Sequence, residues 1–125
     1  MKKHILLTCV SLLVSLLSIS ASIEVRSTHM TTTYGLANNS ICYIFQDSKG
    51  FIWMGTLNGL SRYDGNSFVT FLPESESGNN RISLSTNHAR TISEDKNGFL
   101  WIETSGEFFN CYDLRKDCFV DFTGC

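Results

Sequence analysis

The sequence is poor in the features that mark several common classes of protein. Its 125 residues include a single proline, and 10 Lys plus Arg nearly balance 12 Asp plus Glu, for a formal net charge of −2. It contains no basic cluster, which argues against nucleic acid as a partner. Beyond the N-terminal region, no apolar run reaches the ~20 residues of a membrane-spanning helix. Because kinase, phosphate-loop and metal motifs are also missing, the sequence predicts no catalytic residue, metal site or cofactor.

The first 22 residues have the three-part pattern of a secretory signal peptide. Lys2 and Lys3 form a basic start, residues 5–17 are mostly apolar, and residues 18–22 are small and compatible with cleavage. The apolar run is short for a membrane span of about 20 residues. We therefore predict export with cleavage near Ser22, and the alternative is an uncleaved N-terminal anchor.

Five cysteines are present, and Cys9 leaves with the predicted signal peptide. Cys42, Cys111, Cys118 and Cys125 then remain in a compartment that permits disulfides. Their spacing matches no zinc pattern, and their three full pairings stay open. Cys42 lies in an apolar alternation and is predicted to be a small buried residue. A bridge between Cys111 and Cys118 across a hairpin is the less favoured alternative.

A ten-residue segment of the chain occurs twice. Asp47–Thr56 returns as Asp95–Thr104, with Asp, Gly, Phe, Trp and Thr at matching places and an offset of 48 residues. A fixed period of roughly 40–50 residues, with a Gly turn and a Trp in each copy, indicates a repeat architecture. Since one copy cannot bury its apolar face alone, we expect the copies to pack side by side.

Each copy predicts four short strands joined by tight turns. The segments are rich in β-branched and aromatic residues, and Asp-Xaa-Xaa-Gly or Asn-Gly sequences separate them. The expected strands are 41–46, 51–56, 60–64 and 67–71, then 90–94, 99–104, 108–113 and 118–122. Such a sheet is one blade of a β-propeller, and a ring needs four to eight. The predicted fold is therefore all-β, with two four-stranded antiparallel blades of an incomplete propeller.

The predicted organisation has five parts. They are a signal peptide (1–22), an N-terminal strand and connection (23–39), blade 1 (40–71), a connecting loop (72–87) and blade 2 (88–125). The loose alternation from Ile23 to Thr33 predicts an isolated strand, which by hypothesis completes the last blade and closes the ring. Because the sequence stops at the end of a fourth strand, we expect a truncated gene product, a gene fragment or a partial sequence.

Three segments of the first copy resemble the two-component regulator propeller repeat. They are residues 35–41, 46–56 and 58–65. In this family, such repeats build the periplasmic sensor of hybrid two-component histidine kinases in polysaccharide-degrading gut Bacteroidetes. The second copy departs from the pattern, because Glu103 replaces the glycine seen at Gly55 and the stretch 105–110 is longer and lacks the Gly-Leu pair.

The resemblance implies the N-terminal part of a periplasmic ligand sensor and no enzyme. A full-length relative is anchored in the inner membrane, carries a kinase and is expected to act as a homodimer. Its expected ligand is an oligosaccharide, and its expected output is the regulation of polysaccharide utilisation. No nucleic acid partner is expected for this chain. One alternative is a stand-alone secreted repeat protein that oligomerises, and a less favoured one is a fragment of a propeller lyase or hydrolase.

The repeated residues are predicted to be structural. Trp53 and Trp101 are expected to pack between blades rather than stack on sugars. Asp47 and Asp95 are expected to cap turns rather than form an acid–base pair. The pairs Tyr63-Asp64 and Tyr112-Asp113, which end the third strands, are expected to be structural for the same reason.

Ligand contacts are expected where the two copies differ. The connection Leu72–Asn87 and the stretch Ser105–Asn110 are the natural candidates, because loops carry recognition on rigid frames. No single ligand residue is assigned. His29 and His88 stand in no recognisable catalytic order. The Asn38-Asn39-Ser40 segment matches an N-glycosylation pattern, which we interpret as coincidence.

Overall fold

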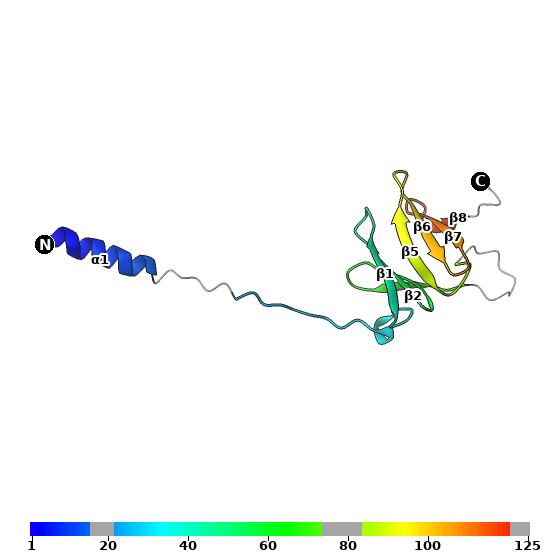
Figure 1. The fold of residues 1–125 in the computed structure, drawn as a ribbon, viewed down its shortest axis with the longest axis horizontal. Helices are drawn as coiled ribbons and strands as arrows, with labels where there is room; N and C mark the ends of the chain where they lie inside the picture. Colours follow the sequence, from blue (N-terminus) through cyan, green and yellow to red (C-terminus); the bar gives the residue numbers. More distant parts are fainter. Residues whose placement is uncertain (16–21, 74–83, 121–125) are drawn as a thin grey trace.

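The computed structural model describes residues 1–15, 22–73 and 84–120. Helix α1 (Lys2–Ser15) lies at the N-terminal end, away from two β-sheets (Figure 1). A short 3-10 helix, η1 (Thr32–Tyr34), precedes the first sheet. Within these described ranges, no helix has the length and apolar character needed to span a membrane. Most of the predicted cleavage region, residues 18–22, lies outside the described residues.

Each copy of the repeat forms one four-stranded antiparallel sheet. We call them sheet A and sheet B, and their strand orders are β1-β2-β3-β4 and β5-β6-β7-β8. The strands are β1 (Ile41–Gln46), β2 (Ile52–Thr56), β3 (Gly59–Tyr63), β4 (Phe68–Phe71), β5 (Ala89–Glu94), β6 (Phe99–Thr104), β7 (Phe108–Asp113) and β8 (Cys118–Val120). The predicted all-β fold with two blades of an incomplete propeller is confirmed.

The two sheets share an irregularity in their first strands. The pairing of β1 with β2 shifts register between Ile41 and Tyr43, and the pairing of β5 with β6 shifts between Ala89 and Thr91. The two shifts fall at the same place in the repeat. Such a shift is a β-bulge, in which one extra residue leaves the regular alternation of side chains.

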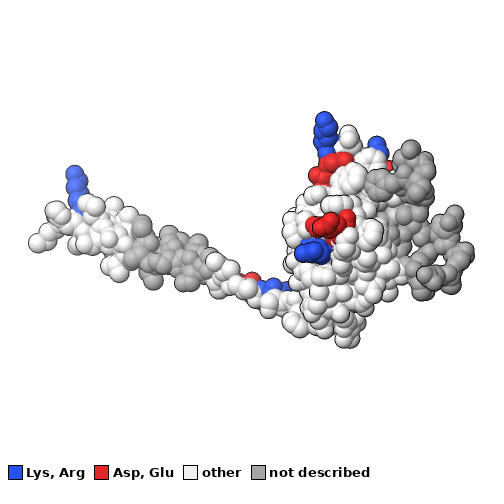
Figure 2. All heavy atoms as spheres, turned by 45° about the vertical axis from the view of Figure 1, so that its right-hand side comes forward, with Lys and Arg blue, Asp and Glu red and all other residues white. Residues whose placement is uncertain are grey.

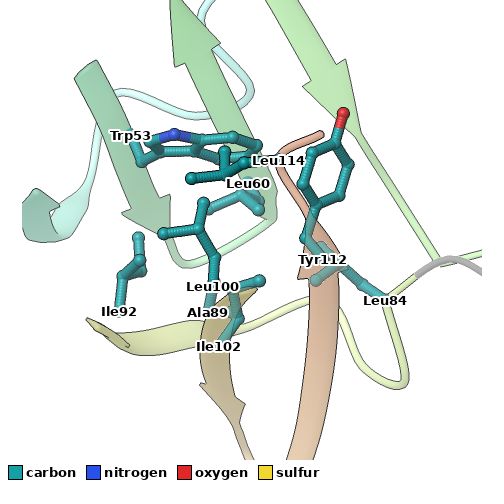
Figure 3. Packing of buried hydrophobic residues seen from close by; sticks show 9 residues of the cluster. All are labelled: Trp53, Leu60, Leu84, Ala89, Ile92, Leu100, Ile102, Tyr112 and Leu114. Atoms are coloured by element: carbon teal, nitrogen blue, oxygen red, sulfur yellow. The ribbon is translucent and has the colours of Figure 1, made fainter. Parts of the chain in front are cut away.

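The hydrophobic core lies between the two sheets, and its side chains point toward one another (Figure 3). First strands β1 and β5 lie side by side, and β2 also contacts β5. The buried cluster consists of Trp53, Leu60, Leu84, Ala89, Ile92, Leu100, Ile102, Tyr112 and Leu114. The repeat copies therefore bury their apolar faces against each other, as the sequence predicts. On the face shown in Figure 2, charged side chains form small mixed groups on a largely uncharged surface.

Two predictions about local structure are wrong. No strand forms from residue 22 to residue 31 in this chain, because no described strand pairs with the segment there. Cys42 is exposed rather than buried, because it is the extra residue of the bulge in β1 and leaves the apolar alternation. Residues 105–107 form a tight turn that leads directly into β7, which begins at Phe108 as predicted.

The bridge between Cys111 and Cys118 does not form. Cys111 lies opposite Val120 and Cys118 lies opposite Asp113, so the two cysteines are not facing residues of the β7–β8 pair. Cys42 and Cys118 carry free thiols. Cys125 lies outside the described residues, as does the predicted end of the last strand at residue 122.

Candidate functional site

The contact between sheets A and B, which we call the seam, brings together polar side chains that are distant in sequence. Arg62 of β3 donates hydrogen bonds to the hydroxyl of Tyr112 (3.1 Å) and to the carboxylate of Asp117. The Tyr112 hydroxyl donates to Asp117 Oδ1 at 2.7 Å. The Arg62 guanidinium also lies 4.9 Å from the ring centroid of Phe51 and 5.5 Å from that of Trp53. This network joins the two repeats.

The electrostatics of the network fix its protonation states. Burial raises the pKa of Tyr112 above its usual value, and the hydrogen bond to Asp117 raises it further. Arg62, and then Tyr112, lower the pKa of Asp117 below its usual range. Neither group therefore titrates near neutral pH. We conclude that this cluster holds the seam together and does not transfer protons.

The first turn of sheet A makes a second polar contact across the seam. The Ser48 backbone N–H and hydroxyl donate to the Glu94 carboxylate at 2.8 Å and 2.5 Å. The Lys49 ammonium group donates to the carbonyl of Leu114. Both contacts anchor this turn on sheet B. Residues that look like ordinary turn positions in the sequence are therefore part of the packing between repeats.

The two repeated aspartates cap turns, as predicted. Asp47 Oδ1 accepts hydrogen bonds from the backbone N–H groups of Lys49 (2.9 Å) and Phe51 (3.0 Å), and Oδ2 accepts one from Trp53 Nε1 (2.7 Å). The Asp95 carboxylate makes the matching three bonds to Asn97 N, Phe99 N and Trp101 Nε1, at 2.8, 3.0 and 3.1 Å.

These bonds leave the aspartates unsuited to acid–base catalysis. Hydrogen bonds from Phe99 N–H and from the Trp101 indole lower the pKa of Asp95, so it stays ionised near neutral pH. Sequence reasoning missed the bond to the indole. The constant spacing of six residues between each Asp and the following Trp, present in both copies, was the available signal.

The two repeated tryptophans have different environments. Trp53 is fully buried in the seam, where it stacks on Phe71 (centroids 5.7 Å apart) and meets the edge of Tyr112 (5.0 Å). The predicted packing between blades is therefore confirmed for Trp53. Trp101 is only half-buried, because it lies on the face of sheet B that points away from the seam.

The structure brings Cys42 and His88 together across the seam. The Cys42 sulfur lies 3.4 Å from His88 Nε2. Sequence reasoning treated His88 as a lone histidine, because the two residues are far apart in the chain. Within the described ranges, no group of three or more His, Cys, Asp or Glu side chains could hold a metal ion. The pair therefore has no third ligand, and we assign it no metal. His29 is exposed in the N-terminal segment.

The two stretches predicted to contact ligand are partly structural. Asn110 Oδ1 accepts from Ser85 N at 3.0 Å, and Asn110 Nδ2 donates to Ser85 Oγ at 3.0 Å. Leu84 lies in the core. These residues therefore fix the connection before sheet B. Residues 74–83 of the predicted ligand loop lie outside the described residues.

The Asn38-Asn39-Ser40 segment has a local structural role. Asn38 Oδ1 accepts from the Ser40 backbone N–H at 2.8 Å, and Asn39 Oδ1 accepts from Thr32 N at 2.9 Å. Both amides therefore shape the connection into β1.

The family match falls on both repeat copies. A family profile described as the two component regulator propeller matches residues 35–58 and 83–106. Both copies of the repeat are therefore similar to the two-component regulator propeller repeat. The matched segments lie 48 residues apart, as the repeated aspartates and tryptophans do. Each match covers the first two strands of one sheet.

A solved structure extends this assignment. It is described as the extracellular domain of a hybrid two-component system from B. thetaiotaomicron, and it is 29% identical to this chain with a TM-score of 0.68. The similarity covers 74% of this chain but only 13% of the other. A search of curated proteins gives no match. The propeller repeats of this chain therefore correspond to a small part of a larger extracellular domain.

Proposed function

We propose that this chain is part of the periplasmic ligand-sensing propeller of a hybrid two-component sensor. The observation that carries this proposal is the agreement between the two propeller repeats and the extracellular domain of such a system. The sensor would detect glycan fragments and regulate polysaccharide utilisation. This chain would supply scaffold and ligand-facing loops, and no catalysis, since its two repeated aspartates are occupied as turn caps.

Export is part of the same proposal. Helix α1 contains most of the apolar run that follows Lys2 and Lys3, and an export signal of this kind is removed after translocation. Fractionation of cells that express the full chain would test this step. We expect a periplasmic product whose N-terminus lies near Ser22. A product that keeps residues 1–15 and stays with the membrane would instead support an uncleaved anchor.

The signalling step is proposed to be a shift between two arrangements of a sensor homodimer. A ligand that binds one arrangement more tightly than the other shifts the population toward it. A rigid seam between repeats suits this role, because it transmits a change at a loop to the rest of the propeller without local unfolding.

The sensing proposal can be tested in the bacterium that carries the gene. Trp53→Ala should disrupt the seam and abolish transcriptional induction by one polysaccharide in a panel, while growth on simple sugars is retained. The matched control is Lys96→Ala, which changes an exposed side chain at a turn of sheet B. Normal induction by every polysaccharide in the Trp53→Ala strain, with the variant protein shown to be unfolded, would refute the proposal.

A further inference from the structure

The contact between Cys42 and His88 joins two positions at which the repeat copies differ. Cys42 is the extra residue of the bulge in β1, and the matching residue of the bulge in β5 is Arg90. His88 and Ser40 also occupy matching places. The backbone carbonyl of each accepts a hydrogen bond, at 3.1 Å, from the turn between the second and third strands of its own sheet. Because neither residue recurs, a cysteine beside a histidine is not needed to build either sheet.

The backbone around His88 is held by both sheets. The carbonyl of Asn87 accepts a hydrogen bond from Gly59 N of sheet A, and the carbonyl of His88 accepts one from Ser105 N of sheet B. The next residue, Ala89, is completely buried. The half-buried imidazole of His88 therefore starts from a fixed point of the backbone. Holding a reacting group in place in this way removes part of the entropic cost of its reaction.

The Cys42 thiol is open to solvent. It is free and exposed, because the bulge takes it out of the regular alternation of the strand. Its sulfur lies 3.4 Å from His88 Nε2, within hydrogen-bond range of a thiol. A thiol reacts as the thiolate, and an adjacent imidazole can take its proton. The pair thus combines an accessible nucleophile with a positioned base.

A second exposed thiol of the same chain serves as a reference. Cys118 is also free and exposed, and it lies opposite Asp113 in the pairing of β7 with β8. Among the described residues, the hydrogen bond between a cysteine and a histidine is the one that Cys42 makes. A difference in reactivity between Cys42 and Cys118 therefore reports the effect of His88.

We propose that Cys42 is a site of reversible thiolation, with His88 as its general base and a low-molecular-weight disulfide as its substrate. The Cys42 thiolate attacks one sulfur of the disulfide, and the thiol proton passes through His88 Nε2 to the departing sulfur. One S–S bond breaks and another forms, so that one half of the substrate is joined to Cys42 and the other half leaves as a thiol.

This modification goes beyond the proposed sensing function. The Cys42 sulfur is oxidised and the released sulfur is reduced, so no further oxidant is required. The modified sulfur has no proton to share with His88, and thiolation therefore also removes one link across the seam. The export proposed above would carry the thiol into a compartment that permits disulfides.

The test compares two thiols within one full-length chain. The chain is incubated with excess cystine at neutral pH, and mass spectrometry follows the mixed disulfides at Cys42 and Cys118. Peptide fragmentation distinguishes Cys118 from Cys125, since no Lys or Arg lies between them. A thiol half ionised at pH 7 carries about 16 times more thiolate than an ordinary thiol, and its lower nucleophilicity reduces this gain to about threefold. We expect Cys42 to react faster than Cys118 by about this factor or more.

Two perturbations should remove this advantage. Unfolding in urea separates Cys42 from His88 without any substitution, so the ratio of the two rates should fall toward one. In the folded chain, His88→Gln keeps a polar side chain that cannot take the proton, and it should slow Cys42 while Cys118 is unchanged. The matched control is His29→Gln, because His29 is exposed in the N-terminal segment. The urea midpoint of unfolding checks that both variants fold.

Chemical rescue separates a base from a purely structural side chain. Added imidazole should restore the rate at Cys42 in His88→Ala and should change the rate at Cys118 much less. The proposal is overturned if the ratio of the two rates is the same in the folded and the urea-unfolded chain. It is equally overturned if folded His88→Gln reacts at Cys42 as fast as the unsubstituted chain, or if no mixed disulfide forms at Cys42.

Discussion

Whether Gly55→Ala raises or lowers the free energy of unfolding tests how closely the two repeats pack. Gly55 has no positive φ, so alanine can adopt its backbone conformation. In open space, such a change would stabilise the protein by about 0.4–1 kcal/mol, because alanine loses less backbone entropy on folding. In this structure the new Cβ would lie 2.7 Å from the Ala89 carbonyl oxygen, and a backbone atom cannot move aside as a flexible side chain can.

We therefore expect Gly55→Ala to destabilise the protein. Overpacking a close contact costs about 1–3 kcal/mol; the middle of this range, about 2 kcal/mol, exceeds the entropic gain of about 0.7 kcal/mol and leaves a net loss of about 1 kcal/mol. Urea unfolding measures this loss as a lower midpoint with an unchanged slope. The matched control is Glu103→Ala, at the same place in sheet B, where no sheet of the described residues lies across from it. Its effect should stay within about 0.5 kcal/mol.

The outcome that refutes this reasoning is a Gly55→Ala protein as stable as the unsubstituted chain, or more stable. Such a result would mean that sheet B does not approach sheet A as closely as the structure shows. A large loss in both Gly55→Ala and Glu103→Ala would also count against it, since only Gly55 faces the seam.

Three further predictions concern the seam. Trp53→Ala should lower the free energy of unfolding by about 3–5 kcal/mol. Trp101→Ala should lower it by clearly less, because of the two tryptophans only Trp53 is fully buried. Equal losses of the two variants in urea unfolding would contradict this prediction. Tyr112→Phe removes the hydroxyl between Arg62 and Asp117 and should lower the free energy of unfolding by about 1–3 kcal/mol in the same assay. An unchanged free energy of unfolding would show that the network does not contribute to stability. The folded-state pKa of Asp117 is lowered, so its stabilising contribution is present above the unfolded value of about 3.9 and is lost as pH falls below it. The urea midpoint should therefore fall on acidification, and it should fall less steeply in Asp117→Asn; identical acid profiles would exclude this role.

Much of the fold could be predicted because its signals are local. Asp47 and Gly50 specify a turn through bonds that span at most four residues, and the flanking β-branched and aromatic residues favour strands. Because the segment occurs twice in the sequence, the same turn and strand signals are present in both copies. The predicted bounds of β1, β6 and β7 agree with the structure residue for residue.

The errors arose where local pattern and tertiary contact disagree. The alternation around Cys42 predicts burial, but the bulge takes this residue out of the alternation. The segment from Ile23 has a loose strand pattern, but a strand needs a partner for its backbone hydrogen bonds, and the described strands provide none. The proposal that this segment closes a complete ring stays a prediction.

The sequence by itself determined the repeat, its period, the turns and the two four-stranded sheets, because these depend on interactions between residues close together in the chain. Only the tertiary structure decided which faces are buried. It also decided that Arg62 meets Tyr112 and Asp117, that Cys42 meets His88, and that Gly55 must be glycine. These contacts join residues more than 30 positions apart, and their geometry depends on how one sheet packs against another, which no local propensity encodes.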